Sequence, residues 1–293
     1  TATMGSSGGS SIIPNFVNYN FNDIGNIDAN IDFELLNLRN STINIQSIEF
    51  GTSYFTSNTL FPINIEPFNI GTINISTNNE LNGGLIEDYM NINSEDLPNN
   101  SSIELIFNSV SGNILSGNLT GQISNNTYLI SNDIKITEDN TLTISPGTKF
   151  LFEGPYSFNI EGELIAIGTM QDSIIFESSN NQNLWTGMHL KNTSNDTHIE
   201  FIRISNVGEG DAVLQAPLSI SSANNSTVKN ILINFNNIPS SCGGLTVAGS
   251  TLNIENIVIN NNTATTMLMV DQSNTTLNKF IINSNNIAGG LFG

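Results

Sequence analysis

The chain has 293 residues, of which seven are Lys or Arg and 26 are Asp or Glu, so its formal net charge is −19 and its isoelectric point is near 4.1. A charge of this sign makes binding to nucleic-acid phosphates or to anionic membranes unfavourable, which argues against both as partners. The single cysteine, Cys242, excludes an internal disulfide and a cysteine-based metal cluster, and no apolar run is long enough to span a bilayer.

Charged residues make up only 11% of the chain, so its polar surface consists mainly of amides and hydroxyls, with 50 asparagines in the sequence. The opening TATMGSSGGS is small and uncharged, which predicts a flexible segment over residues 1–13.

Residues 14–119 contain short segments in which apolar and polar side chains alternate, the pattern of half-buried β-strands. Asparagine-rich and glycine-containing spacers separate these segments, and none of the segments has a helical period. Several strands at this spacing are typical of a β-sandwich. The expected strands are Ile31–Leu36, Ile43–Phe50, Phe61–Ile65, Thr72–Ile75 and Ser102–Phe107.

The same region contains a series of motifs: an opening Phe and Gly, a Leu-Asn pair, an Ile-x-x-Ile, an Ile-x-Ser-x-Asp and a final strand that ends in Gly. They occupy Phe21, Gly25, Leu36, Asn37, Ile45, Ile48, Ile92–Asp96 and Leu105–Gly112. In this order the motifs resemble those of the hydin-type (ASH) immunoglobulin-like domains, although Glu95 stands where Asn is more usual. The resemblance implies an immunoglobulin-like β-sandwich over residues 14–119 and brings no catalytic residues with it.

From about residue 118 the segments shorten and a repeat begins. Four segments with apolar residues at their first, fourth and sixth positions align without gaps, and their starts lie 29, 26 and 23 residues apart. A second apolar series interleaves with the first at a similar spacing, so the two together predict a solenoid of stacked parallel strands. The first series starts at Ile199, Val228, Ile254 and Leu277, and the second contains Met188, Leu190, Leu218, Ile220, Leu245, Val247, Leu268, Val270 and Leu291.

Residues 141–176 contain still shorter apolar segments broken by glycines, which predicts the irregular entry to this solenoid. The run LTISPGTKFLFEGPYSFNIEGELIAIGT, with SIIFES, LWTGMHL and IEFIRIS after it, resembles the first coils of bacterial surface right-handed β-helix proteins. The resemblance implies a right-handed parallel β-helix over residues 120–293 and therefore an all-β chain. It implies no particular activity, because this fold occurs in lyases, hydrolases, adhesins and scaffolds.

Asparagine pairs recur at one point of each regular coil, where a sharp corner is expected. Asparagine tolerates the left-handed backbone conformation of such corners, and stacked side-chain amides can hydrogen-bond to one another. We therefore predict a ladder of asparagines along this corner. Its candidate members are Asn236, Asn237, Asn261, Asn262, Asn285 and Asn286.

The final segment, GGLFG, begins another strand without completing a coil, so the last coil is expected to be incomplete or uncapped. An open apolar end of a solenoid favours contact either with more chain or with another subunit. The candidate assembly surface comprises Leu268, Val270, Leu291 and Phe292.

Charged residues of the solenoid do not align into a catalytic site. The repeat alignment places Lys229 between Glu200 and Glu255, which predicts a surface ion-pair ladder rather than a pair of catalytic carboxylates. Arg203 falls at a different position of the repeat, so it does not stack with Lys229 into one site.

The remaining candidates favour structural roles. His189 and His198 have no acid or thiol at a useful spacing, and Trp185 is expected to pack in the core. Glu209 and Asp211 lie in a loop that could hold a cation only weakly. No metal site and no cofactor are predicted.

These patterns favour a non-enzymatic extracellular or cell-surface protein, a structural scaffold, stalk or adhesin. Its expected partners are other protein subunits or cell-surface glycans, with a homopolymer formed through the open solenoid end as a subordinate version. The alternative is a polysaccharide-binding or polysaccharide-cleaving β-helix protein, which rests on the likeness of fold alone.

Overall fold

The computed structural model describes residues 12–78, 84–97, 101–110, 112–180, 182–191, 197–210 and 215–287. Within these ranges every regular element is a β-strand and none is a helix. The chain divides into two compact units, Thr1–Gly117 and Asn118–Gly293. The predictions of an all-β chain and of a β-solenoid in its C-terminal part are therefore confirmed.

One sheet of the first unit has four strands in the order β2-β10-β9-β5. Strand β10 runs parallel to β2 and antiparallel to β9. Apolar residues alternate along β10, which buries Ile103, Leu105 and Phe107 on one face, as the sequence pattern requires. The strands are β2 (Asn18–Ile24), β5 (Ser47–Phe50), β9 (Gly84–Asn93) and β10 (Ser102–Ser109).

Among the other strands of this unit, β3 pairs antiparallel with both β1 and β8, whereas β4 and β7 form a separate two-stranded sheet. The expected single strand Ile43–Phe50 is two strands, β4 and β5, because Gln46 separates them and they join different sheets. The strands are β1 (Ile12–Pro14), β3 (Asn30–Asn37), β4 (Ile43–Ile45), β6 (Phe55–Thr56), β7 (Ile63–Ile65), β8 (Ile70–Thr77) and β11 (Ile114–Asn118).

Inward side chains from both groups of strands form one hydrophobic core. Phe21 of β2, Phe33 of β3 and Phe107 of β10 are all fully buried in it. The rings of Phe55 and Phe107 lie 5.5 Å apart at 81°, the edge-to-face arrangement that aromatic quadrupoles favour. Burial of these large side chains is the main source of this unit's stability.

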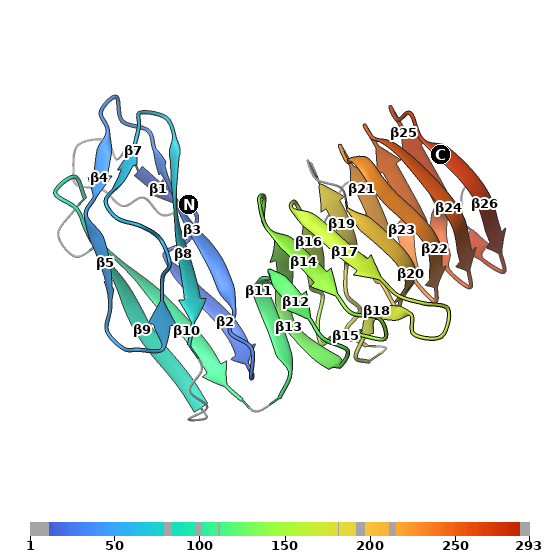
Figure 1. Ribbon diagram of the computed structural model, residues 1–293, viewed down its shortest axis with the longest axis horizontal. Coiled ribbons are helices and arrows are strands. Elements are labelled where there is room, and N and C mark those ends of the chain that lie inside the picture. The colour runs from blue at the N-terminus through green and yellow to red at the C-terminus, as the bar shows by residue number, and fades with distance from the viewer. Residues whose placement is uncertain are drawn as a thin grey trace. The chain divides into compact units, whose positions relative to one another are not determined.

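The second unit is a parallel β-solenoid of about six turns, drawn from green to red in Figure 1. Its strands pair in parallel with the coil before and the coil after, and they stack into three faces. The first face consists of β12, β14 and β17, followed by the first halves of β20, β22, β24 and β26. The bounds are β12 (Gly121–Ile123), β14 (Thr141–Ile144), β17 (Glu163–Ile167), β20 (His198–Ser205), β22 (Asn224–Asn234), β24 (Thr251–Asn260) and β26 (Thr276–Asn283).

The second and third faces complete each coil. The second face begins with the first half of β13, continues with β15 and β18, and then takes the second halves of β20, β22, β24 and β26. The third face takes the second half of β13 and then β16, β19, β21, β23, β25 and β27. The new bounds are β13 (Thr127–Ile136), β15 (Lys149–Phe152), β18 (Ile174–Ser178), β16 (Ser157–Ile160), β19 (Gly187–Lys191), β21 (Leu218–Ser221), β23 (Asn237–Ala248), β25 (Thr263–Asp271) and β27 (Asn286–Ile287).

Both repeat series predicted from the sequence are confirmed in register. Ile199 pairs with Val228, Val228 with Ile254, and Ile254 with Leu277. The second series is stacked in the same way, from Met188 through Leu218 and Leu245 to Leu268. The drifting spacing in sequence therefore reflects corner and loop lengths, because the strands themselves remain aligned.

Each regular corner is made by a single residue with a positive φ angle. At the corner between the first and second faces these residues are Phe201, Asn230, Asn256 and Lys279, with φ between 51° and 57°. The left-handed conformation turns the chain within one residue, and asparagine adopts it more readily than most residues. The corner after the second face uses Asn206, Phe235, Asn261 and Ser284, and the third corner uses Ser222, Gly249 and Gln272.

Stacked aromatic rings fill the early coils. The rings of Phe150 and Phe176 lie 4.8 Å apart at 10°, and those of Phe152 and Trp185 lie 4.2 Å apart at 13°. Trp185 is fully buried, as the sequence predicts, and its indole N–H donates to the Ser205 carbonyl at 2.9 Å. The polar atom of this large side chain is therefore satisfied inside the core.

Candidate functional site

Three asparagines form a hydrogen-bonded ladder at the corner that follows the second face. The Oδ1 of Asn262 accepts from the backbone N–H and from the Nδ2 of Asn236, both at 2.9 Å. Asn262 in turn donates from its backbone N–H and its Nδ2 to the Oδ1 of Asn285, at 2.9 and 3.0 Å. Asn236 and Asn262 are only 2% and 1% exposed, so these amides are satisfied almost entirely by one another and by neighbouring backbone.

The other predicted ladder members lie outside it. Asn237, Asn261 and Asn286 are exposed, so the ladder is one asparagine wide rather than two. Asn261 instead supplies the left-handed corner residue, while Asn237 and Asn286 begin the next strands. A shorter amide stack, which the sequence analysis missed, joins Asn256 Nδ2 to Asn230 Oδ1 at 2.6 Å.

The candidate assembly residues are only partly described. Leu268 is 4% exposed and belongs to the core, whereas Val270 is 37% exposed. Leu291 and Phe292 lie outside the described residues. In β26, the last long strand described, Ile281 is 50% exposed.

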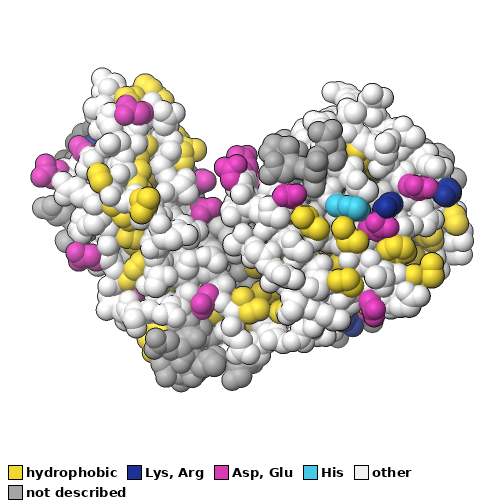
Figure 2. Space-filling model, in the orientation of Figure 1, with side chains coloured by type: hydrophobic (Ala, Val, Ile, Leu, Met, Phe, Trp, Pro, Cys, Tyr) yellow, Lys and Arg dark blue, Asp and Glu magenta, His cyan; other side chains and the backbone are white. Residues whose placement is uncertain are grey.

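The predicted Glu200–Lys229–Glu255 column is two separate ion pairs, Lys229 with Glu200 and Lys279 with Glu255, and Lys229 acts on Glu255 through its charge. Lys229 Nζ lies 3.0 Å from Glu200, and Lys279 Nζ lies 2.9 Å from Glu255. His198 Nε2 also lies 3.2 Å from Glu200. Figure 2 shows basic side chains beside acidic ones on the visible face of the solenoid.

These contacts change the ionisation of the two carboxyl groups. Partial burial acts to raise the pKa of Glu200, but hydrogen bonds from Lys229, His198 and Asn230 outweigh it, so the pKa is lowered. The hydrogen bond and charge of Lys279 likewise lower the pKa of Glu255. Both carboxylates are held in their charged form, which suits an ion-pair ladder and not a proton-donating acid.

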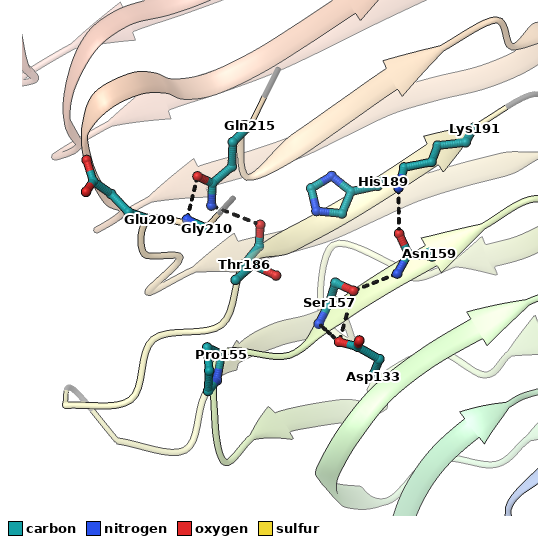
Figure 3. A pocket seen from close by; sticks show the side chains of 10 residues that line it. All are labelled: Asp133, Pro155, Ser157, Asn159, Thr186, His189, Lys191, Glu209, Gly210 and Gln215. Carbon is teal, nitrogen blue, oxygen red and sulfur yellow. Dashed lines mark hydrogen bonds between the residues drawn. The ribbon is translucent and has the colours of Figure 1, made fainter. Parts of the chain in front are cut away.

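A polar groove of about 480 Å³ lies on the third face, at the early coils of the solenoid (Figure 3). One side of it is a relay across neighbouring strands. Ser157 donates from its N–H and Oγ to Asp133 Oδ1 at 2.7 and 3.0 Å, and Asn159 Nδ2 donates to Ser157 Oγ at 2.6 Å. Lys191 Nζ completes the relay by donating to Asn159 Oδ1 at 3.0 Å.

Loops between the second and third faces form the opposite side. The Oε1 of Gln215 accepts from the Gly210 N–H at 2.6 Å, and its Nε2 donates to the Gly208 carbonyl at 2.7 Å. Glu209 accepts from the Ser240 N–H at 2.8 Å, and the Ser240 side chain, followed by this N–H, lowers the pKa of the Glu209 carboxyl. In Figure 3 the His189 ring lies between these loop residues and the relay.

His189 is the most perturbed group of the groove. It is 6% exposed, and desolvation together with the nearby charge of Lys191 lowers its pKa to about 4, although a hydrogen bond with the Thr186 backbone opposes this. The ring is therefore neutral at pH 7 and has one donor and one acceptor nitrogen. Sequence spacing could not reveal the groove, because its residues come from several coils and three loops.

The other residues singled out from the sequence are Cys242 and the pair Glu209 and Asp211. Cys242 is fully buried, and burial raises the pKa of its thiol, so it is a core residue. Asp211, the partner expected for Glu209, lies outside the described residues. Among the residues that are described, no three His, Cys, Asp or Glu side chains gather as metal ligands, and no helix is suited to crossing a membrane.

No protein-family model matches the sequence, and comparison with curated protein sequences found no match. Among solved structures, the chain is similar to the ASH / PapD-like domain of human CEP192, with 9% identity and a TM-score of 0.30 over 38% of this chain and 94% of that domain. The YadV chaperone gives 15% identity and a TM-score of 0.27, over 33% of this chain and 51% of that one. A protein of unknown function from Porphyromonas gingivalis W83 gives 11% and 0.29, over 34% of this chain and less than half, 46%, of that one. Scores at this level carry no argument about function.

Proposed function

We propose that this chain is a non-enzymatic structural or adhesion protein of the cell surface, with its solenoid as scaffold or stalk. The observation that carries the proposal is how the basic side chains are used: all six Lys and Arg residues of the second unit contact a polar partner on a neighbouring coil. Side chains engaged in this way fasten one coil to the next. The pairs are Lys135–Glu161, Lys149–Glu177, Arg203–Glu177, Lys229–Glu200, Lys279–Glu255 and Lys191–Asn159.

In this proposal the first unit is an immunoglobulin-like domain that acts as a spacer, and the solenoid is a right-handed β-helix. A core shared by two groups of strands, with β2 and β10 paired in parallel, supports the first assignment. The resemblance of the coil sequences to bacterial surface β-helix proteins supports the second.

An antibody raised against the purified chain tests the proposed location. It should label intact cells of the source organism, and mild external protease should remove the signal while a cytoplasmic marker survives. Labelling that appears only after the cells are permeabilised would contradict a surface role.

Assembly of copies through the last described coil is a subordinate proposal, which the partly exposed Val270 supports, because its counterpart one coil earlier, Val247, is buried. Light scattering should show a mass that grows with protein concentration, and Val270→Asp should prevent the growth. A monomer at every concentration would rule this mode of assembly out.

A second candidate function is polysaccharide binding, favoured by the polar groove on the third face. It is compatible with a surface scaffold, because an adhesin must hold its partner. A polysaccharide-cleaving protein would instead release shortened products from a polysaccharide panel, and reducing-end assays distinguish the two.

A further inference from the structure

We infer that the third-face groove binds a short, uncharged oligosaccharide. Charged side chains of both signs line the groove. Asp133 and Glu209 line the groove together with Lys191, so a carboxylate or phosphate ligand would meet two acidic groups and a cationic ligand would meet an ammonium. Because both signs of charge line the groove, the attraction of a charged ligand to one sign is offset in part by repulsion from the other, whereas a neutral ligand meets no such repulsion.

The lining side chains also have hydrogen-bonding groups that are not used within the described residues. Within the described residues, Asp133 uses Oδ1 but leaves Oδ2 free to accept, and Lys191 uses one of its three N–H donors. Neutral His189 uses its ring N–H in the hydrogen bond with the Thr186 backbone and keeps an acceptor nitrogen. Free donors and free acceptors side by side suit a ligand whose groups both donate and accept, and sugar hydroxyls are such groups.

Hydrogen bonds hold the lining side chains in place before a ligand binds. The Asp133–Ser157–Asn159–Lys191 relay and the bonds of Gln215 already fix the side chains that would meet the ligand. Binding then costs less side-chain ordering than it would in an open surface patch. Among the described lining residues there is no Phe, Tyr or Trp, and Pro155 is the one aliphatic side chain, so a single site should bind at about millimolar Kd.

Weak single sites suit adhesion, in which many copies on one surface engage one glycan layer. The inference rests on the proposed surface role for the source of the saccharide and deepens it by naming the ligand class. Saccharide binding is measured on the purified chain, and location is measured by antibody labelling of intact cells. Either test can therefore fail without affecting the result of the other.

Nuclear magnetic resonance of the full chain labelled with nitrogen-15 tests the site. The probes are three neutral oligosaccharides (cellohexaose, maltohexaose and mannohexaose), sialyllactose as the acidic arm and a chitosan hexamer as the cationic arm, each up to about 10 mM. At least one neutral probe should shift the backbone amide resonances of β16 and β19, and the acidic and cationic probes should shift them little. No shift with any neutral probe, or shifts confined to a charged arm, would overturn the inference.

Variants then assign the contact. Asn159→Ala and Lys191→Ala should each weaken the binding of that neutral probe by about tenfold, because each removes part of the relay. Lys279→Ala is the matched control, since it removes a lysine paired with Glu255 on another part of the solenoid. Unchanged affinity in both groove variants would place the ligand elsewhere. Amide shifts on the unmodified chain decide the question if a variant fails to fold.

Discussion

Asn262 joins three successive coils through one side-chain amide. Its Oδ1 accepts two bonds from Asn236, and its Nδ2 donates to Asn285 Oδ1 and to the Ile233 carbonyl at 3.2 Å. Asn262→Ala should therefore lower the free energy of unfolding by about 3 kcal/mol, because it leaves buried polar groups without partners. Urea unfolding measures this. Asn237→Ala, at an exposed asparagine, should change stability by less than about 0.5 kcal/mol, and equal losses in the two variants would show that the ladder does not stabilise the fold.

His189 should make stability depend on pH. Its pKa is about 4 in the folded chain against 6.5 for the free group, so the unfolded chain takes up a proton first as pH falls. The contribution of His189 to the free energy of unfolding should therefore be constant above pH 6.5, decline by about 3 kcal/mol towards pH 4, and level off below pH 4. The lowered pKa of Glu200 adds its own loss at lower pH, where that carboxylate takes up a proton.

The variant His189→Gln isolates this effect in urea unfolding across the pH range. It should remove the decline between pH 6.5 and 4, while His198→Gln, at a more exposed ring, should keep it. A decline that persists in His189→Gln would assign it to other groups.

At the residue scale, the sequence could locate the ladder and include its three members among six candidates, but it could not separate them from the neighbouring asparagines. Each Asn pair offers two amides, and which one turns inward depends on which residue takes the left-handed corner conformation. In the pair Asn261–Asn262 the first residue does so, but in the preceding coil Phe235 occupies that place and Asn236 follows it. The groove was not foreseen, because Asp133, His189 and Gln215 become neighbours only when coils stack.

At the scale of the element, the corners offer a test of backbone strain. Phe235 has φ 58° and is 54% exposed, so it has neither a glycine's freedom nor full burial to offset its left-handed conformation. Phe235→Asn should stabilise the chain by about 1 kcal/mol, since asparagine occupies this corner in two other coils, at Asn206 and Asn261. Thermal unfolding measures the gain. The reverse change, Asn261→Phe, should destabilise, and a loss of stability in Phe235→Asn would show that the ring makes useful contacts.

Strand register in the solenoid could be predicted because every coil repeats the same apolar positions, so Ile199, Val228, Ile254 and Leu277 align by eye. The first unit has no repeat to supply such a check. There the apolar alternation of Ile43–Phe50 changes phase after Gln46, from Ile43 and Ile45 to Ile48 and Phe50, at the point where the chain changes sheets. Period alone does not record which partner a strand takes.

At the scale of the whole molecule, a net charge of −19 remains even when each of the seven Lys and Arg residues offsets one carboxylate. Like charges repel across the folded chain, and salt screens that repulsion. The melting temperature should therefore rise as NaCl is raised from low concentration, despite some weakening of exposed pairs such as Lys279–Glu255. Potassium chloride at equal ionic strength should act equally. A fall in melting temperature would mean that the ion-pair ladders outweigh the net repulsion.

We propose that the chain is a surface scaffold that binds a neutral glycan without cleaving it. One neutral oligosaccharide, incubated with the full chain, can be followed both for binding by amide shifts and for chain length by mass spectrometry. We expect shifts at the groove strands β16 and β19 and an oligosaccharide recovered at its original length. Shortened products, or no shifts with any neutral probe, would contradict this proposal.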